Sequence, residues 1–229
     1  VRSTVERKST ESLNVPTALA SADVSILGGN VKLSNLNVAS PAGFQGQMLS
    51  LASLNIDARV GELRENPVKV RSITVDQPKL IVEMKGTKFN IREFINAMPP
   101  GETDTTSDPV NLVIQSLSVR GAEVVFRPDT TAMSAIPGLA DTLNMENEYV
   151  LPIPDFVMQN VGSGEGHENG VAIKQVITQM IGAMTQAAAQ SDKLPPELRG
   201  LLGGNLDAIK DRLTGEAKKQ LQEAVANIT

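Results

Sequence analysis

The chain has 229 residues, enough for one domain or for two small ones, each able to bury a real hydrophobic core. Its 21 Lys and Arg residues against 26 Asp and Glu residues give a net charge of −5, and only 3% of its residues are aromatic, none of them Trp. This composition argues against a nucleic-acid partner, and the absence of cysteine excludes disulfides, thiolate metal sites and cysteine nucleophiles.

The N-terminal segment carries no signal peptide, and nowhere does the sequence contain the roughly 20 consecutive apolar residues that span a membrane. The sequence begins at Val1 rather than Met, with Arg2, Arg7 and Lys8 close by. Two interpretations stay open. Either this is a mature or trimmed product whose membrane anchor precedes Val1, or the boundary has no meaning.

Residues 15–85 are rich in predicted strands. Residues 22–26 alternate between apolar and polar side chains, and Gly28-Gly29-Asn30 supplies residues that tolerate the positive φ angles of a tight hairpin turn. Gln77-Pro78 separates two later strands. The pattern predicts a sheet built largely from antiparallel neighbours.

One six-residue pattern occurs four times: apolar, any residue, Ser or Asn, apolar, polar, apolar. A repeated strand builds a surface, whereas an active site needs dissimilar groups brought together. The repeats therefore predict a binding or surface-forming protein rather than an enzyme. The copies are residues 33–38, 51–56, 70–75 and 114–119.

The third copy shows a change in alternation, because Val68 and Val70 are followed by Ile73 and Val75. The fourth copy changes at the equivalent place, after Ile114. Such a change re-aims the side chains, as one extra bulge residue does, and a bulge also raises the local twist of the strand. Alternatively, the small polar residue at this point marks the end of a strand, and both interpretations remain open.

The last two copies extend to longer segments, residues 70–83 and 114–127. Each is predicted as strand, turn, strand, so that the chain contains two copies of a β-hairpin unit. Each ends in three consecutive apolar residues, Leu80-Ile81-Val82 and Val124-Val125-Phe126. Such strands carry apolar groups on both faces, which predicts a sheet covered on each side or one with a face on a ligand.

A short helix is predicted between the two copies. Asn90 is a suitable N-cap and Glu93 stands three residues later, the spacing of a capping box. Phe89 and Phe94 match the flanking hydrophobic staple. Pro99-Pro100 ends the helix, and a polar linker follows at residues 101–108.

After Pro128 the strand pattern weakens into an irregular segment at 129–149. Residues 150–158 are extended, and their two prolines suit an edge strand, while 162–170 is a Gly-rich loop. Apolar residues at helical spacing then predict a C-terminal helical pair. They are Ile173, Val176, Ile177, Met180, Ile181 and Met184 in the first helix, and Leu206, Ile209, Leu213, Leu221, Val225 and Ile228 in the second.

The predicted fold class is α+β: a twisted, mainly antiparallel sheet of repeated hairpins, one short mid-chain helix and two C-terminal helices. We expect a single compact unit. Its parts are a β-rich region with a capped helix at 1–100, the linker at 101–108, a second β-hairpin region at 109–165 and the helices at 166–229.

Candidate chemistry is sparse. His167, the single histidine, lies in a flexible loop beside Glu165 and Glu168, without the ligand count or rigid spacing that zinc requires. Gly28-Gly29 and Gly203-Gly204 lack the Lys-Ser/Thr of a phosphate-binding loop. No catalytic, metal or cofactor-binding residue is assigned, and the residues of the binding site are unknown at this point.

Residues 24–98 resemble the N-terminal region of AsmA-family envelope proteins. The resemblance rests on a strand pair, the turn Ser40-Pro41-Ala42-Gly43-Phe44, further strand pairs and Phe89-Asn90-Ile91. Ser40 replaces the Asn common in that family, and both residue types bond to the backbone of turns. Residues 150–164 and the helices after them resemble a small AsmA-like subgroup.

This resemblance implies a bacterial envelope protein in the periplasm, held in the inner membrane by an N-terminal anchor that this sequence does not include. Relatives of this kind are linked to outer-membrane lipid homeostasis. The implied partners are phospholipid or envelope proteins, with no nucleic acid and no cofactor. About ten strands roughly 4.8 Å apart extend only about 50 Å, which is too short for one copy to bridge two membranes.

Three hypotheses follow. The first is a non-enzymatic, membrane-associated protein whose sheet forms an apolar groove for lipid or a membrane-proximal partner. The second is a structural subunit of a periplasmic assembly that pairs through sheet edges. The third, a hydrolase using scattered carboxylates, requires two carboxylates in one enclosed pocket.

Overall fold

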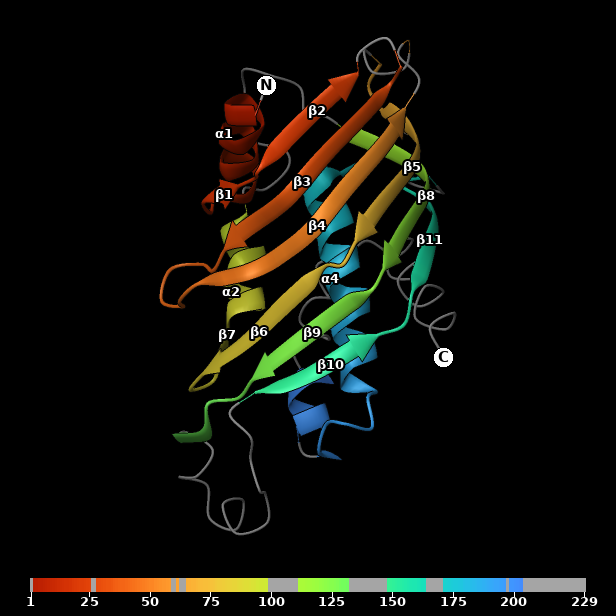
Figure 1. Ribbon diagram of the computed structural model, residues 1–229. Coiled ribbons are helices and arrows are strands. Elements are labelled where there is room, and N and C mark those ends of the chain that lie inside the picture. The colour runs from red at the N-terminus through yellow and green to blue at the C-terminus, as the bar shows by residue number, and fades with distance from the viewer. Residues whose placement is uncertain are drawn as a thin grey trace.

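The computed structural model describes residues 2–25, 28–58, 61, 65–98, 111–131, 148–163, 171–196 and 198–203. It shows an α+β fold in which helices pack on one face of a mixed sheet and the N-terminal helix lies beside one of its edges (Figure 1). Three helices have defined bounds, α1 (Arg2–Leu13), α2 (Asn90–Ala97) and α4 (Ile173–Ala189), and residues 198–203 are also helical. The strands are β1 (Thr17–Ala18), β2 (Ser21–Ser25), β3 (Asn30–Ala39), β4 (Gln47–Ala58), β5 (Val68–Asp76), β6 (Lys79–Lys85), β7 (Lys88–Phe89), β8 (Asn111–Arg120), β9 (Ala122–Arg127), β10 (Tyr149–Ile153), β11 (Phe156–Val161) and β12 (Val171–Ala172).

The two long repeats are not hairpins, and this prediction was wrong. The strands β5 and β6 follow one another as a single bent path, as do β8 and β9 (Figure 1). The two paths pair in parallel, with Val68 opposite Leu112 and Glu83 opposite Arg127, so each residue lies beside its counterpart 44 positions later. The crossover between them contains α2, as parallel neighbours require.

Four strand paths are interrupted at the same transverse row of the sheet, which we call the crease, while β3 and β4 continue through it. It falls between β1 and β2, between β5 and β6, between β8 and β9, and between β10 and β11. Three of its residues have positive φ angles: Asn35 (50°), Gln77 (50°) and Gly121 (58°). In register, the crease residues are Ala20, Asn35, Ala52, Gln77, Gly121 and Pro154.

A second irregular row supports the bulge interpretation of the third repeat. The pairing of β4 with β5 shifts between Asp57 and Ala58, which face Ser72 and Val70, and Arg71 is the extra residue. Asn160 of β11 has a φ of 53° where it passes β8. The strand continues through this point, so the small polar residue does not mark a strand end.

Together these irregular rows keep apolar side chains on one face. In the β5–β6 path the buried residues are Ile73 and Val75 before the crease and Leu80 and Val82 after it, a change from odd to even positions. Because the crease contributes one additional residue, both sets face the same side. Figure 1 shows α2 and α4 on that side.

The predicted capping box of the mid-chain helix is wrong, although the helix itself is confirmed. The N-cap is Phe89, without a side-chain cap bond, and Asn90 is already helical. The buried Asn90 amide instead donates to the Ile81 carbonyl (2.7 Å) and accepts from the Glu83 amide (2.9 Å). Asn90 therefore fastens α2 to β6 rather than terminating the helix.

Helix α1, which no pattern in the sequence predicted, protects the edge of the sheet beside β1. The Thr17 amide donates to Thr10 Oγ1 and the Leu19 amide donates to Glu6 Oε1, each at 3.0 Å. The Leu19 amide, aided by Arg2, lowers the pKa of Glu6 below its ordinary value. The N–H groups that this edge would otherwise expose are thus satisfied.

Other predictions are confirmed in the described residues. The prolyl segment forms the edge strands β10 and β11, Gly29 has the positive φ of a turn residue (68°), and α2 ends before Pro99. The first C-terminal helix is α4. Residues 101–108, most of the irregular 129–149 segment and of the 162–170 loop, and the helix predicted from Leu206 to Ile228 lie outside the described residues.

Candidate functional site

The candidate site is the apolar face of the sheet, which we call the inner wall. The strand register aligns the side chains of the inner wall in rows, because residues directly opposite one another on neighbouring strands share a face of the sheet. One row of direct pairs consists of Leu33, Leu54, Val75, Val119 and Phe156. A row beyond the crease consists of Val38, Leu49, Leu80, Val124 and Leu151.

Helices cover the half of the inner wall formed by β6, β9 and β10. Leu80, Val124 and Leu151 are fully buried there. Helix α4 packs on β9 and β10, and α2 packs on β6. The side chains of Leu194, Leu198 and Leu202, which follow α4, belong to the same buried cluster.

The inner wall is only partly covered at β2 and at the parts of β3 and β4 that lie beside it, whereas inner side chains nearer the crease, such as Leu36 and Leu51, are buried. Val24 is 41% exposed, and its neighbours across the strands, Val31 and Ile56, are half-buried. Ala22 and Leu54 in the adjoining row are also half-buried. We call these five residues the open strip; it continues into the covered half without a polar boundary.

The opposite face, which we call the outer face, is polar over most of its area: Lys32, Asn55, Thr74 and Ser118 form one row of direct pairs. Ser53 Oγ donates to Asp76 Oδ2 at 2.7 Å on the same face. A polar outer face needs no covering layer.

Each of the two runs of three consecutive apolar residues places side chains on both faces of the sheet. Leu80 and Val82 face the inner wall, whereas Ile81 faces outward beside Val125 and Val150. Val125 is fully buried, while Val150 is 46% exposed. The outward apolar groups therefore form a small patch of three side chains rather than a second wall.

Helix α4 fits the inner wall imperfectly. Residues 178–185 are all buried, so the helix is enclosed on every side at its centre. Both polar atoms of the Gln179 side-chain amide are buried, and neither has a hydrogen-bond partner among the described residues. Each such unpaired group costs about 1–3 kcal/mol, which the surrounding apolar packing must offset.

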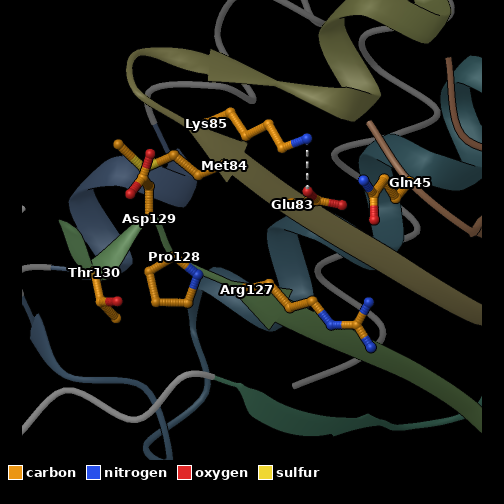
Figure 2. Close-up of a pocket in the computed structure, with 8 residues that line it drawn as sticks. All are labelled: Gln45, Glu83, Met84, Lys85, Arg127, Pro128, Asp129 and Thr130. Carbon is orange, nitrogen blue, oxygen red and sulfur yellow. Dashed lines mark ion pairs between the residues drawn. The ribbon is translucent and has the colours of Figure 1, made fainter. Parts of the chain in front are cut away.

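A shallow depression of about 420 Å³ lies where β6 and β9 end (Figure 2). Its cationic groups already have partners: Lys85 Nζ donates to the Gly43 carbonyl (2.7 Å) and lies 3.7 Å from Glu83, and Arg127 pairs with Glu148 at 2.7 Å. Lys85 also lies over the Phe44 ring at 5.4 Å. These contacts fasten loops to the end of the sheet and leave little charge to hold an anion.

The residues considered for chemistry from the sequence are not brought together. Glu165, His167 and Glu168 lie outside the described residues, as does Gly204. Among the residues that the structure describes, no three His, Cys, Asp or Glu side chains are placed to hold one metal ion. Met180 and Met184 are buried in the core, as their helical spacing predicts.

Comparisons with protein-family models, with curated proteins and with solved structures found no match. Within the described part of the chain, no helix combines the length and apolar character needed to cross a bilayer.

Sequence reasoning missed Gln179 and the open strip for a physical reason. The apolar stripe of α4 predicts one buried face and leaves Gln179 on the other, but the fold encloses both. The alternation of residues 22–26 shows that Val24 faces the core side, yet exposure depends on how far the helices extend over the sheet. The burial of Gln179 and the exposure of Val24 both depend on elements that are distant from these residues in the sequence.

Proposed function

We propose that this chain is a non-enzymatic, membrane-associated protein of the bacterial envelope that binds lipid, or a membrane-proximal partner, on the inner wall of its sheet. In this proposal it works in the periplasm, tethered to the inner membrane. The sequence resemblance to AsmA-family proteins motivates the location and the lipid.

The observation that carries the proposal is the open strip. Binding of a ligand is stabilised by about 25 cal/mol for each Å² of exposed apolar surface that the ligand removes from water. The open strip is such a surface, and it lies beside a continuous apolar wall. An acyl chain lying along Val24, Val31 and Ile56 would meet only aliphatic side chains. The charged depression at the other end of the sheet offers no comparable surface.

The test is native mass spectrometry of the protein purified in mild detergent and incubated with phosphatidylglycerol and phosphatidylethanolamine vesicles. We expect stoichiometric phospholipid adducts on the wild type and a loss of at least fivefold in the Val24→Asp variant. A wild-type spectrum that contains only the bare chain contradicts the proposal.

Val157→Asp is the matched control. Val157 is 39% exposed, close to the 41% of Val24, but it faces outward, since it pairs with Ser118 in the polar row. Adducts should persist in this variant. Their loss there, with retention in Val24→Asp, would place the lipid on the outer face and overturn the proposed site.

A structural subunit is the second candidate, and the sheet edge at β11 favours it. In the described chain β11 pairs on one side only, with β8, and unlike β10 it contains no proline. Edge strands of this kind add to the sheets of neighbouring molecules. Light scattering at high concentration should then report an oligomer that Val157→Lys dissociates, whereas a strict monomer contradicts this candidate.

A further inference from the structure

We infer that α4 is a displaceable cover, and that the inner wall beneath it is a binding site for a phospholipid acyl chain. This inference rests on the proposed function and extends it. The acyl chain enters at the open strip and is then accommodated on the half of the inner wall that α4 covers. The helix and the acyl chain compete for one surface.

Within the described residues, no hydrogen bond joins a polar side chain of α4 to the inner wall. Thr178 Oγ1 donates to the Lys174 carbonyl and Thr185 Oγ1 donates to the Ile181 carbonyl, each at 2.8 Å and each within the helix. Lys174 Nζ donates to the Met98 carbonyl at 2.9 Å, which joins α4 to the end of α2. What holds α4 on β9 and β10 is apolar packing, and acyl chains supply the same kind of contact.

Gln179 raises the free energy of the state in which α4 covers the inner wall. Its amide would hydrogen-bond to water if the helix moved outward, but in the closed structure both of its polar atoms are buried and unpaired. A helix selected only to fill a core would carry an apolar residue at a fully buried position. Gln179 therefore favours release of α4 in a way that Leu or Met would not.

The length of α4 is compatible with the length of a phospholipid acyl chain. With a rise of about 1.5 Å per residue, the 17 residues of α4 cover a length of roughly 25 Å. The hydrocarbon of one leaflet is about 15 Å deep, half of a core of about 30 Å. The surface beneath α4 is thus long enough for one extended acyl chain.

Two substitutions, made in the 229-residue chain, should have opposite effects on thermal stability and on lipid occupancy. Gln179→Met removes the unpaired amide at nearly constant volume, so it should raise Tm and lower phospholipid occupancy roughly tenfold. Lys174→Met removes the bond to α2, so it should lower Tm and raise occupancy. The surface changes Gln190→Met and Lys193→Met are chemically matched controls that should alter neither.

Occupancy is measured with a trace of fluorescent phosphatidylethanolamine in phosphatidylglycerol vesicles, and hydrogen exchange of the α4 amides is followed in the same samples. Lipid should accelerate exchange in α4 while the amides of β8 and β9 stay protected. If wild type binds lipid and Val24→Asp does not, but α4 exchange and Gln179→Met occupancy are unchanged, the cover is refuted and the proposed function survives. If wild type binds no lipid, both fail.

Discussion

Gly121 occupies the crease with a φ of 58°, a conformation that costs a residue with a side chain about 1–2 kcal/mol. A Cβ added there would lie 3.5 Å from Gln77 Cγ, an ordinary contact, so the backbone conformation sets the cost. We predict that Gly121→Ala lowers the free energy of unfolding by about 1–2 kcal/mol, measured by urea denaturation.

Two other positions provide the comparison. Gln77 has a φ of 50° in the same row, and Gln77→Gly should be neutral or stabilising by up to about 1 kcal/mol. Gly200 lies in a helical segment with open space around it, so Gly200→Ala should not destabilise. If Gly121→Ala behaves like Gly200→Ala, the left-handed backbone at the crease is not the source of strain.

Among the elements, α2 depends on one buried amide for its attachment to β6. Asn90 satisfies the Ile81 carbonyl and the Glu83 amide, and its oxygen also accepts from the Ile91 amide (2.8 Å). We predict that Asn90→Ala costs about 2–4 kcal/mol, because backbone groups are left buried and unpaired. Thermal and urea unfolding measure this loss.

Asn37→Ala is the control for that prediction, since the Asn37 amide bonds only to the nearby Asn35 carbonyl at an exposed site. Its cost should stay below about 1 kcal/mol. A capping role for Asn90 would instead predict a small loss that Asn90→Ser or Asn90→Asp restores. Rescue by either substitution would contradict the attachment to β6.

At the scale of the whole molecule, the sheet joins the parts of the chain on either side of the 101–108 linker. The strands β5 and β8 pair in parallel from Val68 to Asp76, and β6 and β9 pair from Lys79 to Glu83. We predict that cleavage at a protease site engineered into 101–108 leaves two fragments that co-elute in gel filtration. Separation of the fragments without denaturant would mean that each part folds alone.

The sequence predicted the elements with strong local patterns. Apolar spacing located α4, and the two prolines of residues 150–158 predicted an edge strand, which the structure divides into β10 and β11. The change of parity after Val70 left a bulge and a strand end open, and the structure shows the bulge. The helix α1 was missed because most of its side chains are polar and it bonds to the sheet edge through Glu6 and Thr10.

The repeat was recognised but its pairing was not. A hairpin and a bent strand share one signature, two apolar runs around a turn residue, and only the partner across the sheet distinguishes them. Gln77 and Gly121 interrupt their strands at one row because the two copies lie side by side. Two adjacent strands cannot bend at different rows without breaking their register.

By itself, the sequence determined what is periodic: an apolar face on every strand, apolar helices to pack on it, and a repeat of 44 residues. The tertiary structure alone decided how much of that face is covered, where Gln179 lies and which strands pair with one another. Periodicity records the face on which a side chain lies, because that depends on backbone geometry within a few residues. Exposure depends on elements that come from distant parts of the chain, and no local pattern encodes where they stop.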